Sequence, residues 1–366
     1  MQNSLNNRIK FGTKRMKRLI RMFACKLAIP VKYCKFLYYS SQKSKVSTKD
    51  HVVILNTSLE TDNIGDNIIM HYCNKLLAPL LDGKEVYNIP THRFLSKEEL
   101  EYVKSAKVAI VCGTNFLSHN LEVKSIWKFK SNMLTIPNII LLAVGSDGID
   151  KANFYSRKAY YSIFNNGFCH SVRDSHTYNL LQSCGVGNVI NTGCVTTWGL
   201  TNTKDSIPKE KGQSVIFSIT GYYNYSEYDK YLVECLRSNY EKLFFWPQGD
   251  MDLEYLNTFV DLSDITILER NLDCFEKCLE QEKIDYVGSR LHGGIHALNH
   301  GKRTIIISVD NRASDMREDL NLPVISIYDV KEKLNSMIND SWETEIKINQ
   351  SVIDSWKAEI KRIILD

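Results

Sequence analysis

The chain has 366 residues, 43% hydrophobic and 24% charged, which is enough for two domains of ordinary size and too polar for a bundle of membrane-spanning helices. The charge is uneven: residues 1–50 hold 13 Lys and Arg and one acid, whereas residues 51–366 carry a net negative charge. Because nucleic-acid binding needs a concentrated basic surface, the body of the chain is not expected to bind DNA or RNA.

Residues 1–50 are predicted to form a basic amphipathic leader followed by a polar linker. On a helix over residues 14–29, apolar side chains fall on one face and Lys and Arg on the other, as in helices that lie on an anionic bilayer. A helix packed on the protein's own body, or a partly disordered arm, would fit the same pattern. The leader is thus predicted to be a membrane-surface helix, with a helix packed on the body or a partly disordered arm as the alternatives.

Two features indicate the compartment. No segment reaches the ~18 consecutive apolar residues that a membrane span requires. The ten cysteines lie within apolar runs and form no CxxC pair, which is typical of reduced core thiols rather than of disulfides or a zinc site. We therefore expect a cytoplasmic protein, held peripherally at the inner face of the membrane if the leader binds there.

From residue 51, continuous apolar runs of strand length alternate with amphipathic segments of helix length, which indicates parallel sheets covered by helices on both faces. Residues 201–213 are polar, contain Pro and Gly, and separate two such series. The predicted fold class is therefore α/β, with two Rossmann-like domains, 51–205 and 206–345, that face each other across a cleft. A helix over residues 346–366 is expected to pack back on the first domain.

The predicted elements follow in chain order. In the first domain, strands are expected at residues 52–55, 108–112, 139–144, 168–172 and 188–190, with helices at 66–77 and 175–184. In the second domain, strands are expected at 214–219, 243–246, 265–268, 286–288 and 304–309, with helices at 225–240, 252–262, 275–281 and 291–300. No P-loop and no GxGxxG sequence accompanies a strand, which argues against a kinase and an ordinary nicotinamide dehydrogenase.

The most informative segment, residues 284–309, places Arg290 and His292 at the N-terminus of a helix that follows a buried strand. Free N–H groups and the helix dipole favour an anion at such a position, and Gly293 and Gly294 would let it approach the backbone. Arg290 can hold a carboxylate or phosphate with two hydrogen bonds, and His292 can exchange a proton near neutral pH. The alternative is a structural histidine beside an arginine in a surface ion pair.

Three histidines of this helix, His292, His296 and His300, lie on one face, an arrangement that can bind zinc. The helix of a zinc protease needs the sequence HExxH, and Gly293 stands where its glutamate would be. We therefore predict no metal ion, and interpret His296 and His300 as polar positions along the helix.

Polar residues also follow a strand of the first domain. Arg173 comes directly after the strand at 168–172, with Asp174 or Ser175 as the cap of the next helix. We expect Arg173 to point into the cleft between the domains. An ion pair between Arg173 and a helix-terminal acid is the alternative.

The loop after the first strand contains Asn63, Gly65 and Asp66, and would form a rim suited to a hydroxyl-rich ligand. Asp66 could equally be only the N-cap of the following helix. Asn115 and Asp147 stand in loops after the next two strands and are expected at the same edge of the sheet, although both loops could be ordinary turns.

Three of these segments resemble the polysaccharide pyruvyltransferase family: DNIGDNII at residues 62–69, SVRDSHTYNLLQSCGV at 171–186 and SRLHGGIHALNHGKRTIII at 289–307. The resemblance covers residues 51–330, and implies a glycosyltransferase-B-like fold and transfer of pyruvate from phosphoenolpyruvate to a sugar as a cyclic ketal. The acceptor would be a surface polysaccharide precursor, of a capsule or exopolysaccharide, and is expected to be lipid-linked. The chain departs from the family at residues 112–115, where a triple glycine is usual, and at His296, where an apolar residue is usual.

The resemblance also implies roles for the residues. The carboxylate and phosphate of the donor are expected to be bound by Arg173, Arg290, Leu291, Gly293 and Gly294. Catalysis is expected from His292 as acid and base, with Arg290 and Asp66. The acceptor is expected to contact Asn63, Asp66, Asn115 and Asp147. No metal or redox cofactor is needed.

Two other functions fit parts of the sequence. A glycosyltransferase that uses a sugar nucleotide would share the two-domain cleft, although the sequence has no clear ribose-binding glutamate after the phosphate helix. A non-catalytic scaffold of a glycan assembly complex would tolerate the loss of His292, whereas an enzyme would not.

Overall fold

The computed structural model describes residues 34–42, 49–121 and 127–366. The helix predicted over residues 14–29 and most of the linker lie outside this part of the chain. Within it, every helix is too short or too polar to cross a bilayer.

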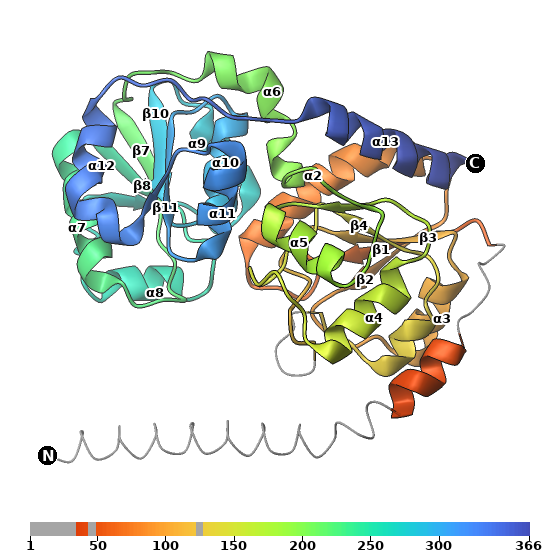
Figure 1. The fold of residues 1–366 in the computed structure, drawn as a ribbon. Helices are drawn as coiled ribbons and strands as arrows, with labels where there is room; N and C mark the ends of the chain where they lie inside the picture. Colours follow the sequence, from red (N-terminus) through yellow and green to blue (C-terminus); the bar gives the residue numbers. More distant parts are fainter. Residues whose placement is uncertain (1–33, 43–48, 122–126) are drawn as a thin grey trace, which may run out of the picture.

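The first domain is built on parallel strands (Figure 1). They are β1 (Val52–Asn56), β2 (Val86–Pro90), β3 (Val108–Cys112), β4 (Ile139–Leu142), β5 (His170–Val172) and β6 (Val189–Asn191). Four of them lie in the order β2-β1-β3-β4, and the pair β5-β6 continues from β4 through a bridge between Val144 and Val172. Every residue of β1 and β3 is buried, as a strand covered on both faces requires.

The second domain contains a six-stranded parallel sheet. Its strands are β7 (Ser214–Ser218), β8 (Lys242–Phe245), β9 (Ile265–Ile267), β10 (Ile284–Gly288), β11 (Thr304–Ser308) and β12 (Val324–Ser326). They lie in the order β12-β11-β10-β7-β8-β9, and all neighbours run parallel. The predicted α/β class with two parallel sheets is confirmed, and every predicted strand is present.

Helices connect successive strands and cover the sheets. In the first domain they are α2 (Ile64–Leu81), α3 (Lys97–Ser105), α4 (Phe154–Phe164) and α5 (Ser175–Ser183), with α6 (Leu200–Thr203) leading to the second domain. In the second domain they are α7 (Ser226–Asn239), α8 (Asp252–Asn257), α9 (Leu272–Leu279), α10 (Leu291–Asn299), α11 (Asn311–Leu320) and α12 (Val330–Asn339). The strands β2 and β12 and the helices α3, α4, α11 and α12 are absent from the sequence prediction.

The last helix, α13 (Gln350–Leu365), returns to the first domain (Figure 1). Its buried apolar residues belong to the same hydrophobic cluster as Val52 and Ile54 of β1. The indole N–H of Trp356 donates to the carbonyl oxygen of Cys169 at 2.9 Å. Helix α13 is therefore part of the first domain's core, although it follows the second domain in sequence.

The two domains meet where α2 packs against α10. At this contact the Tyr72 hydroxyl lies 3.0 Å from Nδ1 of His296, and the N–H of Ile64 donates to the carbonyl oxygen of Gln248 at 3.0 Å. Loops that follow strands of both sheets are thereby brought together at the domain interface.

Candidate active site

His292 lies in the first turn of α10, where only 6% of its surface is exposed. The pKa of its imidazole is lowered to about 3, mainly by burial and also by the positive charges of Arg173 and Arg312, while Asp310 opposes the shift. Its Nε2 lies 3.8 Å from the Sγ of Cys194. The imidazole is therefore neutral near pH 7 and lies close to two guanidinium groups, one from each domain.

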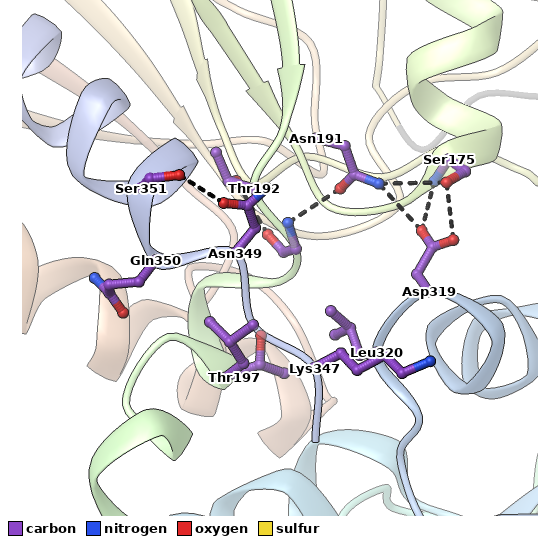
Figure 2. Close-up of a pocket in the computed structure, with 12 residues that line it drawn as sticks. Ser175, Asn191, Thr192, Thr197, Asp319, Leu320, Lys347, Asn349, Gln350 and Ser351 are labelled. Atoms are coloured by element: carbon purple, nitrogen blue, oxygen red, sulfur yellow. Dashed lines mark hydrogen bonds between the residues drawn. The ribbon is translucent and has the colours of Figure 1, made fainter. Parts of the chain in front are cut away.

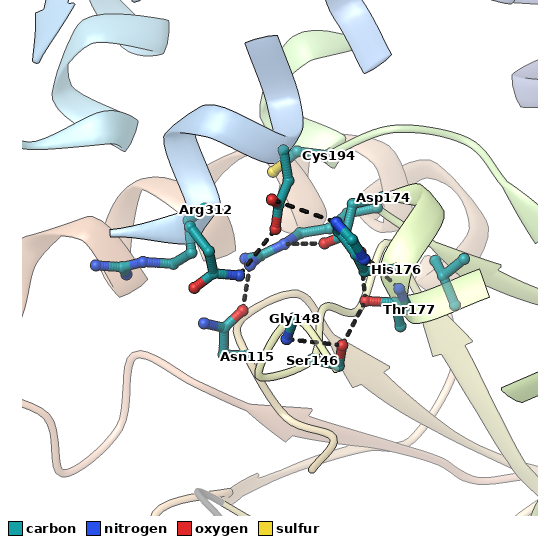
Figure 3. A network of polar contacts seen from close by, with 12 residues as sticks. Asn115, Ser146, Gly148, Asp174, His176, Thr177, Cys194 and Arg312 are labelled. Atoms are coloured by element: carbon teal, nitrogen blue, oxygen red, sulfur yellow. Dashed lines mark hydrogen bonds and ion pairs between the residues drawn. The ribbon is translucent and has the colours of Figure 1, made fainter. Parts of the chain in front are cut away.

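Arg173 follows β5 and is 2% exposed. Its Nε donates to the carboxylate of Asp174 at 3.2 Å, and its Nη2 donates to Oδ1 of Asn115. Asp174 in turn caps α5 by accepting from the N–H of Thr177 at 2.7 Å (Figure 3). The backbone of Gly145 lies so close to the guanidinium that a methyl group at this position would collide with it. The ion pair of Arg173 with a helix-terminal acid, the alternative predicted from the sequence, is thus present. It holds Arg173 at a position where its positive charge lowers the pKa of His292.

Arg312 is a second cation near His292 that is absent from the sequence prediction. It stands in the first turn of α11, after β11, and its Nε and Nη2 donate to both carboxylate oxygens of Asp310 at 2.6–3.1 Å. Burial alone would raise the pKa of Asp310, but Arg312, with Arg173, holds it below its usual value. The positive charge of Arg312 also acts to lower the pKa of Asp66. Arg312 therefore belongs to the second domain, while its charge also acts on a carboxyl group of the first.

The surroundings of Arg290 differ from the ligand-binding position that the sequence predicts. Its Nε and Nη2 donate to both carboxylate oxygens of Asp252, which is fully buried. The charge of Arg290 is thus balanced within the second domain, and among the described residues it is not one of the charges that shift the pKa of His292. The structure places Arg173 and Arg312 at His292, and the donor-binding role of Arg290 stays a prediction.

The residues that begin α10 hold this helix on the sheet. A Cβ on Gly293 would collide with Tyr286 of β10, and one on Gly294 with Ile306 of β11. Leu291 belongs to a hydrophobic cluster of the second domain. These three residues therefore have a packing role, and the donor-binding role predicted for them stays a prediction. No side chain of the described residues caps the first turn, so its N–H groups can still bind an anion.

Asp66 is buried in the first turn of α2 and does not cap this helix. The N-cap is Asn63, whose Oδ1 accepts from the N–H of Gly65 at 3.1 Å. The Asp66 carboxylate accepts from the hydroxyl of Thr61 at 2.9 Å. Burial raises the pKa of Asp66, although the hydrogen bond from Thr61 opposes the shift. The interpretation of Asp66 as an N-cap is wrong, and its carboxyl is instead a buried group with an increased affinity for a proton.

The two other residues predicted to bind the acceptor contact neighbouring side chains. Asn115 accepts from Arg173 and so positions its guanidinium. Asp147 accepts from the hydroxyl of Ser118 at 2.9 Å and lies 2.7 Å from Nδ1 of His119, which joins two loops of the first domain. Among the described residues, neither is hydrogen-bonded to the loop that follows β1.

His296 and His300, interpreted from the sequence as polar positions, differ in the structure. His296 is fully buried, and its Nε2 lies 3.1 Å from a carboxylate oxygen of Glu276. Burial is the main reason that the pKa of His296 is lowered to about 3. His300 is exposed at the end of α10. The interpretation as a polar surface position therefore fits His300 alone.

A hollow of 610 Å³ is lined by residues of both domains, most of them polar (Figure 2). At its edge, the backbone N–H and the hydroxyl of Ser175 each donate to the carboxylate of Asp319 at 2.8 Å, which joins α5 to α11. Lys347 is the only cation among its described lining residues. The hollow therefore lacks the paired cations of a site for a doubly charged ligand, and it contains none of the predicted site residues.

A second hollow, of 400 Å³, lies on the second domain, and its lining includes Tyr222, Tyr223 and Tyr255. Tyr222 and Tyr223 follow β7 and expose 52% and 41% of their surface. The ring of Tyr222 lies over the guanidinium of Arg290 at 4.6 Å, and Tyr223 is close enough to Arg312 to affect its pKa. An exposed aromatic surface therefore borders the charged groups of the domain interface.

The structure thus brings together three of the predicted residues, Arg173, His292 and Asp66, and adds Arg312. Two guanidinium groups can hold a small ligand with two anionic groups, and a neutral imidazole beside them can take up and deliver a proton. A buried carboxyl with a raised pKa can accept a proton from a hydroxyl. Such a set is suited to acid–base chemistry on an anionic donor and a hydroxyl acceptor.

Comparisons with known proteins concern the family and the fold of the chain. A sequence model of the family described as polysaccharide pyruvyl transferase matches residues 63–311. No curated protein matches the chain. Among solved structures, S. aureus MnaA with UDP is 12% identical, with a TM-score of 0.50 over 86% of this chain and 96% of that one. The UDP-GlcNAc 2-epimerase of Methanocaldococcus jannaschii is also 12% identical, with a TM-score of 0.48 over 84% and 98%. The likeness to MnaA concerns the fold alone, and the expected glycosyltransferase-B-like class is confirmed.

Proposed function

The chain belongs to the polysaccharide pyruvyl transferase family, and from this membership we propose that it transfers pyruvate from phosphoenolpyruvate to a sugar of a surface polysaccharide precursor, forming a cyclic ketal. The observation that carries the proposal is the group of Arg173, Arg312 and His292 at the domain interface. Arg173 follows β5 of the first domain, whereas Arg312 and His292 lie on α11 and α10 of the second, so they form one site only when the two domains are packed together.

Phosphoenolpyruvate fits this group by charge. It carries a carboxylate and a phosphate on three carbons, and each anionic group can take charge-assisted hydrogen bonds from one guanidinium. The uncapped N–H groups at the start of α10 would add donors for the phosphate. Arg173 and His292 are 2% and 6% exposed, so we expect the domains to separate before the donor can enter.

The transfer would proceed by proton donation to the methylene carbon of the donor. Binding of an anion beside Arg173 and Arg312 would offset their charges and raise the pKa of His292, which would then carry a proton. Protonation of the methylene gives positive character to C2, and a sugar hydroxyl attacks there. Inorganic phosphate leaves, and a second hydroxyl attacks the same carbon. Of the two protons that the hydroxyls release, one replaces the proton delivered to the methylene carbon and the other is taken up by the phosphate.

The acceptor would be held between the two domains. Asp66, with its raised pKa, can accept the proton of the attacking hydroxyl from the first domain. The exposed rings of Tyr222 and Tyr223 offer flat apolar surfaces with a polar edge on the second domain, a combination suited to a sugar ring. We propose that the acceptor is lipid-linked and is met at the membrane surface, where the basic leader would hold the protein.

The direct test is an assay with phosphoenolpyruvate and a panel of lipid-linked glycans. We expect the glycan to gain the mass of one pyruvate ketal and one inorganic phosphate to be released for each ketal formed. A thermal-shift series with phosphoenolpyruvate and with UDP and CMP sugars separates this activity from that of a glycosyltransferase. Stabilisation by a sugar nucleotide and not by phosphoenolpyruvate would contradict the proposal.

Arg312 gives a more specific prediction. Replacing Arg312 by Gln is expected to raise KM for phosphoenolpyruvate at least tenfold, because a charged hydrogen bond to an anion contributes about 1.5–3 kcal/mol. Arg317→Gln is the matched control, since it removes an exposed arginine of the same helix outside the site. Equal KM values in the two variants would show that Arg312 does not bind the donor.

A further inference from the structure

Three potential metal ligands gather on the second domain, away from the group around His292. His296 and His300 are four residues apart on α10, and Glu276 comes from α9. One ligand atom from each of the three residues lies within 4.8 Å of the other two. We call these residues the histidine–glutamate cluster. The cluster can be reached from solvent, because Glu276 is half-buried and His300 is exposed.

Hydrogen bonds to Nδ1 of both histidines leave Nε2 of each ring available as a metal ligand. Nδ1 of His300 lies 2.9 Å from the carbonyl oxygen of His296, so Nδ1 carries the hydrogen and Nε2 of the neutral ring has a free lone pair. Nδ1 of His296 lies 3.0 Å from the Tyr72 hydroxyl, which can accept its hydrogen in the same way. A metal-binding histidine almost always donates its second N–H to such an oxygen, so both rings have the outer partner that a metal site needs.

The spacing of the rings also fits one ion. Two imidazoles bound to a tetrahedral Zn²⁺ at about 2.0–2.1 Å have ring centroids about 5 Å apart. The centroids of His296 and His300 are 4.5 Å apart, and Nε2 of His296 is 3.1 Å from the Glu276 oxygen. A second close ring is that of His71 on α2, whose centroid is 5.9 Å from that of His296. One ligand atom from each of Glu276, His296 and His300 therefore lies near the distance at which the three could share an ion.

We propose that Glu276, His296 and His300 bind a structural Zn²⁺ ion. Two imidazole nitrogens and a carboxylate oxygen are ligands that zinc takes in proteins, and a water molecule can complete the tetrahedron. The ion joins α9 to α10 and, through the Tyr72 hydroxyl, stabilises the contact of α10 with α2 of the first domain. It lies toward the C-terminal end of the helix whose first turn carries His292, so it takes no part in the transfer chemistry.

The test uses the full chain without a polyhistidine tag, stripped of metal and dialysed against Zn²⁺. We expect one zinc per chain, with affinity reduced at least tenfold by His300→Ala and by Glu276→Gln, both at accessible positions. Tyr72→Phe keeps all three ligands and removes only the outer hydrogen bond, so it should weaken binding about 10–100-fold. Co²⁺ in place of Zn²⁺ should give the intense visible absorption of a tetrahedral site.

His176→Ala is the matched control. His176 is also close to two carboxylates, but it contacts Asp150 through Nδ1 and Asp315 through Nε2, so these groups cannot converge on one ion. Its loss should leave zinc binding unchanged. The proposal is overturned if the parent chain binds no more zinc than His300→Ala, or if Co²⁺ gives the weak spectrum of an octahedral ion. Pyruvate transfer is measured in a separate assay, so the zinc content and the Co²⁺ spectrum do not depend on whether the protein is a pyruvyltransferase.

Discussion

Replacing His292 by Gln is expected to lower kcat for pyruvate transfer by about 10²–10⁴-fold, the usual contribution of a positioned acid or base. Glutamine has a similar size but cannot deliver a proton. Among the described residues, the only hydrogen-bond partner of His292 is the Sγ of Cys194, at 3.8 Å. The thermal midpoint of the variant should therefore stay close to that of the parent protein. Full activity in this variant would remove the proposed mechanism.

The pH profile distinguishes an acid from a merely structural residue. In the free protein the pKa of His292 is about 3, because burial and the charges of Arg173 and Arg312 outweigh that of Asp310. The bound anion should raise this pKa, so kcat is expected to fall as the pH rises through the new value, where the proton is lost. The limb that falls with rising pH should be missing in His292→Gln. An unchanged profile in the variant would assign the acid to another group.

Replacing Arg290 by Ala is expected to destabilise the protein by about 3–5 kcal/mol, because it leaves the fully buried carboxylate of Asp252 without its cation. Urea unfolding measures the change. Adding Asp252→Asn to this variant should recover part of the loss, because the amide removes the negative charge and can still accept from the N–H groups of Gln248 and Gly249. A loss of activity in Arg290→Ala would thus come in part from the lower stability of the folded protein.

The matched control for Arg290→Ala is an exposed ion pair of the same domain. Arg237 donates to Asp264 at the surface, where such a pair contributes at most about 1 kcal/mol. Arg237→Ala should therefore unfold at nearly the parent urea concentration. If Arg290→Ala behaved in the same way and lost only its affinity for phosphoenolpyruvate, Arg290 would be a donor-binding residue, as the sequence predicts.

Among the parts of the fold that the sequence predicts correctly are the fully buried strands. β3 and β11 are short runs whose residues are all buried, and such runs are typical of the centre of a parallel sheet. β2 is only partly buried and ends at Pro90, and α3 buries only Leu100 and Val103 among charged residues. The positions of these two elements depend on packing against neighbours far away in sequence, which a local pattern does not contain.

The candidate site was predictable where a residue directly follows a strand. Arg173 follows β5 and His292 stands shortly after β10, so the rule that ligands bind at the carboxyl ends of strands finds both. Arg312 stands after β11 by the same rule, and the segment from Asp310 to Arg312 is the signal that could have identified it.

Partners distant in sequence could not be predicted. The carboxylate that binds Arg290 comes from Asp252, 38 residues earlier, and no spacing rule connects them. Gly293 and Gly294 illustrate a second limit of local patterns, because a glycine pair fits a ligand contact and close packing of a helix on a sheet equally well. The close packing becomes visible only from the positions of Gln248, Tyr286 and Ile306, which a local pattern around the two glycines does not contain.

The return of α13 has a consequence for synthesis on the ribosome. The first domain emerges from the exit tunnel long before residues 350–365 are translated, so the apolar face that Trp356 covers stays open while the second domain is being made. During that interval the nascent chain offers this face to chaperones or to the α13 segment of a neighbouring polypeptide. Fragments that stop before residue 350 would keep the face uncovered and should aggregate.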